Sequence, residues 1–194
     1  MKLWIATGNR HKLQEIGAIL GDSVSLRCQL DLPGMADVEE TGATYRENAE
    51  IKARALWERV REPVFADDSG LEVDALDGRP GIHSQRYSAP NPTHEKNIDK
   101  LLNELADLPP DKRSARFRCV ICFIDDTGVS RFFEGTLEGR IGFERRGKGG
   151  FGFDPVFMLP ERGCSVAELT EEEKNRISHR GRAVVELKRF LQLP

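Results

Sequence analysis

The chain has 194 residues, of which 39% are hydrophobic and 31% charged, so it can bury the core of one large domain or of two closely joined lobes. Its net charge of -3, with both signs mixed along the chain, argues against bulk nucleic-acid binding, which needs a basic face. No apolar run approaches the ~18 residues of a membrane span, and residues 1–6 are too short for a signal-peptide core. We therefore expect a cytoplasmic protein with neither membrane nor nucleic-acid partners.

The first predicted strand, residues 2–6, is followed by a glycine-containing turn and a helix. Leu13, Ile16 and Leu20 recur at helical spacing and give that helix a buried face. Backbone N–H groups at a helix start attract anions, and Lys12 adds a full charge there, so the turn is a candidate phosphate site. The alternative is an ordinary strand–helix turn capped by Asn9. The residues of this turn are Thr7, Gly8, Asn9, Arg10, His11 and Lys12.

A second predicted strand, residues 23–29, and a loop over residues 31–39 lead to the next helix. Thr44 and Glu47 have the spacing of a capping box, so this helix should begin near Tyr45. Its expected buried stripe consists of Tyr45, Ala49, Ala53, Leu56 and Val60.

The most informative stretch begins with the short apolar strand of residues 64–66. Asp67, Asp68 and Ser69 follow it, and Gly70 allows the chain to turn there. Successive strand residues point to opposite faces, so one of the two acids should reach a site at the strand end. A carboxylate beside a hydroxyl suits a hard cation or an activated water. The alternative is a tight acidic turn in which Asp and Ser cap their own backbone.

Two charged residues around the preceding helix extend this picture. Glu40 lies just before that helix, where its carboxylate could join Asp68 around a cation. Asn48 and Lys52 are four residues apart and share a helical face. The ordinary alternative for Lys52 is a solvated lysine.

The middle of the chain predicts structure more than chemistry. A helix starting at residues 91–93 carries a leucine-rich stripe and should end at Pro109–Pro110. Two strand patterns, Ser114–Ile124 and Val129–Arg140, are joined by a turn and predict a hairpin, hence a mixed sheet. Cys119 and Cys122 are three apart on one strand and face opposite sides, so they cannot share a metal, and free thiols are expected.

The stretch from Gly147 to Phe157 contains four glycines that let the backbone approach a ligand. Phe151 and Phe153 flank Gly152 and offer flat apolar faces that suit a nucleobase. Asp154 could accept hydrogen bonds from a ring N–H or a sugar. The alternative is a flexible loop anchored by buried aromatic side chains.

The last segment opens with a capping box from Thr170 to Glu173 and predicts a helix that carries Lys174. This helix should run to Gly181, which resembles a C-terminal glycine. His179 and Arg180 would then lie at the helix end, either near a ligand or simply complementing the helix dipole. A terminal amphipathic helix over residues 183–193 follows.

Together, acids beside cations suit a polyanion bound with Mg²⁺, and a flat aromatic slot suggests a nucleoside triphosphate. Six blocks occur in an order that resembles the inosine triphosphate pyrophosphatase family, the noncanonical purine nucleoside triphosphate pyrophosphatases, over nearly the whole chain. The blocks are Thr7-Gly8-Asn9-x-x-Lys12, Glu39-Glu40-Thr41-Gly42, Glu47-Asn48-Ala49 with Lys52, Asp67-Asp68-Ser69-Gly70-Leu71, Gly149-Gly150-Phe151-Gly152-Phe153-Asp154-Pro155 and Ser178-His179-Arg180-Gly181.

This resemblance implies an elongated α/β fold with two lobes about a long central mixed sheet, an active-site cleft between the lobes, and a homodimer. It implies one pyrophosphatase domain over residues 1–194, without a separable linker. The implied reaction converts ITP, dITP and XTP to the monophosphate and pyrophosphate by Mg²⁺-assisted in-line attack of water on the α-phosphorus. Relatives often carry Tyr or Trp where this chain has Phe153, which removes a side-chain hydrogen bond but preserves stacking.

The resemblance also implies roles for individual residues. Asp68 would be the proton acceptor and a metal ligand, and Glu40 a second metal ligand. The implied phosphate contacts are Thr7, Gly8, Asn9, Arg10, His11, Lys12, Lys52 and Ser69, and the implied nucleoside contacts are Phe151, Gly152, Phe153, Asp154, Lys174, His179 and Arg180. Two alternatives remain, a pyrophosphatase with another base preference and a nucleotide sensor without catalysis, although a sensor has no need for Asp68 beside Glu40.

Overall fold

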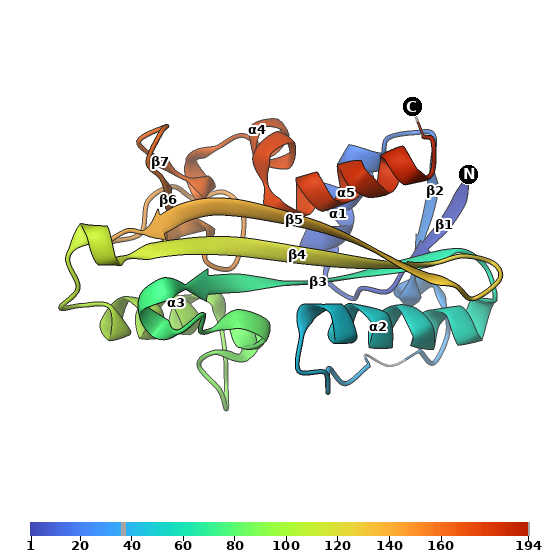
Figure 1. Cartoon of the computed structure of the whole chain (residues 1–194), viewed down its shortest axis with the longest axis horizontal. Helices are drawn as coiled ribbons and strands as arrows, with labels where there is room; N and C mark the ends of the chain where they lie inside the picture. Colours follow the sequence, from blue (N-terminus) through green and yellow to red (C-terminus); the bar gives the residue numbers. More distant parts are fainter. Residues whose placement is uncertain (36–37, 194) are drawn as a thin grey trace. The chain divides into compact units, whose positions relative to one another are not determined.

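The computed structural model describes residues 1–35 and 38–193, and Figure 1 shows its helices and strands along the chain. The strands are β1 (Lys2–Ile5), β2 (Ser25–Cys28), β3 (Val64–Val73), β4 (Ser114–Ile124), β5 (Ser130–Ile141), β6 (Phe157–Leu159) and β7 (Cys164–Ser165). The helices are α1 (Arg10–Leu20), α2 (Tyr45–Val60), α3 (His94–Glu104), α4 (Glu171–Ile177) and α5 (His179–Phe190). Residues 36 and 37 of the predicted loop over 31–39 lie outside the described residues.

The strands of the described residues form one open seven-stranded sheet in the order β2-β1-β3-β4-β5-β6-β7. β1 pairs parallel with β2 and with β3, whereas β6 pairs antiparallel with β5 and β7. The mixed α/β sheet predicted from the hairpin is therefore confirmed. The predicted strand Ser114–Ile124 matches β4, and β5 begins one residue later than predicted.

The chain divides into two compact units, which we describe separately. Unit 1 comprises Met1–Asp68, Cys119–Gly135 and His179–Pro194, and unit 2 comprises Ser69–Arg118 and Thr136–Ser178. β3, β4 and β5 each contribute residues to both units. The domain and cleft that the family resemblance implies stay predictions.

Unit 1 buries both faces of its part of the sheet, as Figure 1 shows for α1 and α5 on one face and α2 on the other. Side chains of β1, α1, β3, β4 and α5 form one core, and side chains of β1, α2, β3 and β4 form the second. Cys119 lies in the first core and Cys122 in the second, so the predicted opposite orientation of the two free thiols is confirmed. A strand buried on both faces needs a continuous apolar run, which β1 has over residues 3–5 and β4 over residues 119–124.

Unit 2 has its own core, where α3, β5 and β6 pack against the second half of β3. Phe117 and Phe157 stack in it with ring centroids 4.3 Å apart. α3 ends at Glu104, earlier than the predicted stop at the prolines. The buried guanidinium of Arg113 donates hydrogen bonds to the carbonyl oxygens of Leu105 and Leu108, just after the helix.

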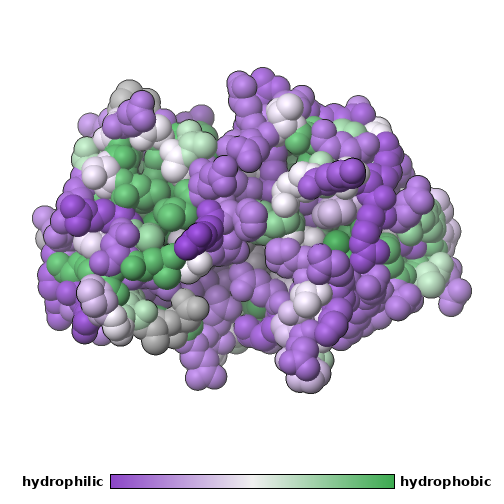
Figure 2. Space-filling view, turned by 180° about the vertical axis from the view of Figure 1, so that it is seen from behind, coloured by the Kyte–Doolittle hydropathy of each residue, from purple (hydrophilic) through white to green (hydrophobic). Residues whose placement is uncertain are grey.

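The two capping boxes are confirmed, so α2 begins at Tyr45 and α4 at Glu171 as the sequence predicts. No helix among the described residues is both long and apolar enough to cross a membrane. The face drawn in Figure 2 is mostly hydrophilic, in keeping with the high content of charged residues.

Candidate active site

The turn between β1 and α1 is organised by its own side chains. Asn9 Oδ1 accepts hydrogen bonds from the backbone N–H groups of His11 and Lys12, at 3.0 and 3.3 Å. Thr7 Oγ1 accepts another from the N–H of Asn9, at 3.1 Å. The interpretation of Asn9 as the helix cap is therefore confirmed. Phosphate binding by residues 7–12 stays a prediction. Two of the backbone N–H groups at the helix start already donate to Asn9.

The acidic pair lies inside β3, not at its end. β3 continues through Gly70 to Val73, so the predicted turn at Gly70 is wrong. The strand that ends here is β1, whose last residue, Ile5, pairs with Phe65. The site is thus created by the end of the neighbouring strand, while β3 itself runs on.

Asp68 is at the centre of a small polar cluster on the α2 side of β3. Lys52 Nζ lies 3.0 Å from Asp68 Oδ1 and 2.7 Å from Glu40 Oε1. Asn48, fully buried on α2, donates its amide to Asp68 at 3.4 Å and accepts the N–H of Gly42 at 2.8 Å. The alternative of a solvated Lys52 is therefore wrong, because its side chain is mostly buried between two carboxylates.

The charges of this cluster shift its pKa values in directions that suit acid–base chemistry. Burial raises the pKa of Asp68, and the nearby Glu40 raises it further, against the opposing effect of Lys52. Burial alone would lower the pKa of Lys52, but Asp68 and the other carboxylates outweigh it and raise the pKa above the usual lysine value. A carboxylate with a raised pKa is a stronger base than an ordinary one, so Asp68 is suited to accept a proton.

Asp67 faces different partners and has the opposite tendency. Its Oδ2 lies 2.9 Å from Lys12 Nζ and 3.4 Å from Arg180 Nε. Burial would raise the pKa of Asp67, but these two cations lower it well below the usual value for an aspartate. Of the two adjacent acids, Asp67 is therefore the poorer base.

His179 and Arg180 begin a helix instead of ending one. α4 stops at Ile177 and α5 starts at His179, so Gly181 lies inside α5 and the predicted C-terminal glycine is wrong. The alternative role in complementing the helix dipole is wrong too, because cations are disfavoured at a helix N-terminus. Arg180 is held there by carboxylates, with Glu15 Oε2 2.6 Å from its Nη1.

The glycine–aromatic loop of unit 2 is tied together by Asp154. Its Oδ2 accepts hydrogen bonds from the backbone N–H of Phe151 at 2.8 Å and from Lys174 Nζ at 2.6 Å. Gly150 has a φ of 70°, and a Cβ there would collide with the Asp154 carboxylate, so only glycine allows this closure. Asp154 and Lys174, expected near a nucleoside, thus form a buried ion pair.

The two phenylalanines of this loop differ in exposure. Phe153 is buried in the core of unit 2, against Tyr87, so its expected flat face is used for packing and the anchoring alternative holds for this residue. Phe151 is half-buried, with Lys174 Nζ 4.6 Å from its ring centroid and the His94 ring 6.4 Å away. Phe151 is the ring suited to stack on a base.

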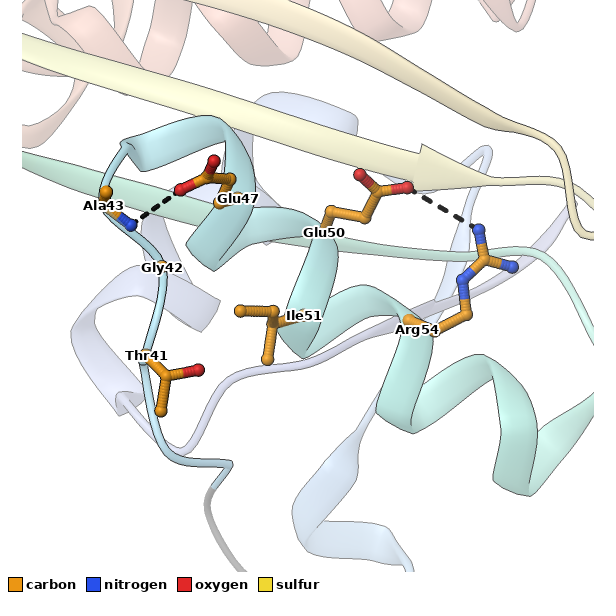
Figure 3. Close-up of a pocket in the computed structure, with 7 residues that line it drawn as sticks. All are labelled: Thr41, Gly42, Ala43, Glu47, Glu50, Ile51 and Arg54. Carbon is orange, nitrogen blue, oxygen red and sulfur yellow. Dashed lines mark hydrogen bonds and ion pairs between the residues drawn. The ribbon is translucent and has the colours of Figure 1, made fainter.

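A cavity of about 620 Å³ lies beside the loop that follows Glu40 (Figure 3). It is lined by Thr41, Gly42, Ala43, Glu47, Glu50, Ile51 and Arg54. None of the predicted site residues lines it. Within this lining, the Ala43 N–H donates a hydrogen bond to Glu47 at 2.6 Å, which ties the loop to the start of α2.

The predicted site residues are divided between the two units. Unit 1 contains the α1 turn, Glu40, Lys52, Asp68, His179 and Arg180, and unit 2 contains Ser69, Phe151, Gly152, Phe153, Asp154 and Lys174. Sequence reasoning gave no role to Asp67, Glu15 or His94. The helical spacing of Asn48 and Lys52 did signal that Asn48 shares a face with the site.

Mg²⁺ is usually held by one or two carboxylates together with substrate phosphates, and it keeps several waters. Glu40 and Asp68 supply such oxygen donors on either side of one ammonium group. The described residues contain no group of three or more His, Cys, Asp or Glu side chains arranged around a metal position. The donor set therefore fits a cation that arrives with its phosphates, better than a cage made of protein alone.

These features define an α/β protein with carboxylate–lysine pairs beside the end of a parallel strand, an arrangement suited to phosphate chemistry. The sequence model of the Ham1 family matches residues 3–190, and this chain belongs to that family. It is 51% identical to the dITP/XTP pyrophosphatase of Halalkalibacterium halodurans, over 98% of this chain and 100% of that protein. It is 48% identical to the dITP/XTP pyrophosphatase of Geobacillus kaustophilus, over 94% and 90%.

Solved structures agree with this assignment. The Ham1 protein of Staphylococcus aureus matches with a TM-score of 0.89 and 39% identity, over 99% of this chain and 98% of that one. A HAM1 protein from Coxiella burnetii matches with a TM-score of 0.90 at the same identity and coverage.

Proposed function

We propose that this protein hydrolyses noncanonical purine nucleoside triphosphates, namely ITP, dITP and XTP, to the nucleoside monophosphate and pyrophosphate. Such an enzyme removes deaminated purines from the nucleotide pool. The observation that carries the proposal is the cluster in which Lys52 joins Glu40 and Asp68, at 2.7 and 3.0 Å. The full-length similarity to two dITP/XTP pyrophosphatases supports the choice of substrate class.

Asp68 accepts the proton of the water that attacks the α-phosphorus in line with the departing pyrophosphate. Asn48 donates a hydrogen bond to its carboxylate and fixes its orientation for this transfer. Lys52 and Lys12 neutralise phosphate oxygens, which makes the phosphorus easier to attack. Glu40 and Asp68 would hold Mg²⁺, which would supply further charge neutralisation on the triphosphate.

The remaining predicted contacts complete the proposal. Residues 7–12 and Ser69 contact the phosphates, and Phe151 stacks on the base. Gly152, Asp154, Lys174, His179 and Arg180 surround the nucleoside, and Phe153, packed in the core of unit 2, supports the loop that carries Phe151 and Gly152. We propose further that residues 1–194 act as one domain, that the protein is a homodimer, and that it works in the cytoplasm without nucleic-acid or membrane partners.

The test is pyrophosphate release from ITP, XTP, dITP, GTP, ATP, CTP and dTTP with Mg²⁺, each with and without EDTA. We expect rapid release from ITP, XTP and dITP, slow release from GTP and ATP, and loss of release when EDTA removes the metal. Pyrophosphate release from CTP or dTTP alone would keep the proposed reaction but would show that the enzyme prefers pyrimidine bases. Orthophosphate, or no product from any nucleotide, would overturn the proposed reaction.

A further inference from the structure

Four charged side chains of unit 1 form an alternating series on the side of β3 opposite Asp68. Lys12 Nζ and Arg180 Nε both approach Asp67 Oδ2, at 2.9 and 3.4 Å. Arg180 Nη1 continues the series to Glu15 Oε2, at 2.6 Å. Lys12 and Glu15 are three residues apart on α1, so the series links α1, β3 and α5 and returns to α1.

The series is buried, which makes its geometry restrictive. The side chains of Lys12, Asp67 and Arg180 are 5%, 1% and 3% exposed, and Glu15 is 15% exposed. Away from water, an ion pair is stronger and its loss leaves a costly unpaired charge. The Asp67 carboxylate is thus the group that holds two cations from two different helices near the end of β1.

We propose that Asp67 is a positioning residue, which fixes Lys12 and Arg180 in the places from which they meet the nucleotide. This inference rests on the proposed function, because it assigns the two cations to the same substrate. Asp67 does not act as a second base, since both cations stand against its carboxylate and Asp68 lies on the other face of the strand. Asp67 influences the substrate mainly through Lys12, because the distance from Asp67 to Lys12, 2.9 Å, is shorter than the distance to Arg180, 3.4 Å.

Removing the Asp67 charge should release Lys12. In Asp67→Asn the side chain keeps its size, but Lys12 and Arg180 lose the carboxylate that both of them contact, and their charges then repel each other. We expect kcat/KM for ITP to fall on the order of 10²-fold, because displacing a binding group by about 1 Å has an effect of that size. Most of the loss should appear as a higher KM, since Lys12 holds the phosphates before and during the reaction.

A double-mutant cycle with Lys12→Met tests whether Asp67 acts through Lys12. If it does, adding Asp67→Asn to Lys12→Met changes kcat/KM by less than about threefold, although each single change is severe. Glu15→Gln is the matched control, because it removes the other carboxylate of the series, which pairs with Arg180 Nη1, and leaves the pair between Asp67 and Lys12 in place. Adding Asp67→Asn to that variant should still lower kcat/KM on the order of 10²-fold.

Each outcome has a defined meaning. If Asp67→Asn unfolds, which its Tm will show, the double variant lacks both members of the pair and is still compared with Lys12→Met alone. Equal fold losses from Asp67→Asn with and without Lys12, or a loss below threefold in the wild-type background, would overturn the positioning role. Absence of pyrophosphate release from the wild-type protein would instead overturn the proposed function, so the two failures are distinguishable.

Discussion

Gly42 is the position where one methyl group should disturb the metal side of the site most directly. A Cβ built on Gly42 would lie 2.6 Å from the Cβ of Glu47 and 2.7 Å from Asn48 Oδ1. Carbon atoms in contact are normally about 3.5–4.0 Å apart, so Gly42→Ala forces the loop roughly 1 Å away from the start of α2. Glu40, two residues earlier, moves with this loop and away from Lys52.

We expect Gly42→Ala to lower kcat/KM for ITP by about 10²-fold, which is a typical result of a 1 Å displacement. The variant should also require more Mg²⁺ for half-maximal rate, on the order of tenfold, because Glu40 is a proposed metal ligand. Overpacking should lower the free energy of unfolding by about 1–3 kcal/mol. Pyrophosphate release measured over a range of Mg²⁺ concentrations, with thermal unfolding of the same samples, checks all three expectations.

Gly17→Ala is the matched control, since a Cβ there meets only Leu26 Cδ2, at 4.0 Å. Gly17 lies within α1, where alanine is favoured over glycine by about 1 kcal/mol, so this variant should keep full activity and equal or greater stability. The reasoning is refuted if Gly42→Ala stays within threefold of the wild type at every Mg²⁺ concentration.

Three further predictions follow from other parts of unit 1. Asp68→Asn should lower kcat by about 10³-fold while ITP still binds, and near-normal turnover in single-turnover assays would contradict its role as base. Gly135→Ala should lower activity by displacing the start of α5, because a Cβ there lies 2.7 Å from Ala183 N; unchanged KM and kcat would count against it. Hydrogen bonds from Thr127, above all, lower the pKa of Asp125 to about 2, so Asp125→Asn should lose about 1 kcal/mol of stability at pH 7. The stability difference between the variant and the wild type should disappear as the pH falls from about 4 to 2. Denaturant unfolding of both proteins at pH 7 and at about pH 2 tests this expectation.

Local signals in the sequence predicted helix starts well, because they depend on contacts within one turn. The capping boxes at Thr44 and Thr170 and the cap at Asn9 are all present. The hairpin between β4 and β5 was predictable for the same reason, since its turn and its strands are adjacent in sequence.

The errors concern features that depend on distant segments. Gly70 resembles a turn glycine in sequence, yet β3 continues through it to Val73. The strand contributes residues to both units, which the local sequence does not reveal. Gly181 resembles a helix terminus, but the break falls at Ser178, where the N-terminal residues of α5 meet the carboxylates of α1 and β3. Phe153 looked like a free aromatic face, and only the packing of Tyr87 reveals that it belongs to a core.

The adjacent acids also explain why one strand can hold two differently charged sets of partners. Because neighbouring residues of β3 face opposite sides, Asp67 meets Lys12 from α1, whereas Asp68 meets Lys52 from α2. One triphosphate can contact both lysines only at an edge of β3 that no neighbouring strand covers, because a ligand there can reach both faces of the strand. In unit 1 this edge of β3 lies beyond Phe65, which pairs with the last residue of β1. Ligands of parallel α/β sheets usually bind just outside the carboxyl ends of the strands, as here at the end of β1. The end of β1, more than any single side chain, therefore determines where the phosphates should bind.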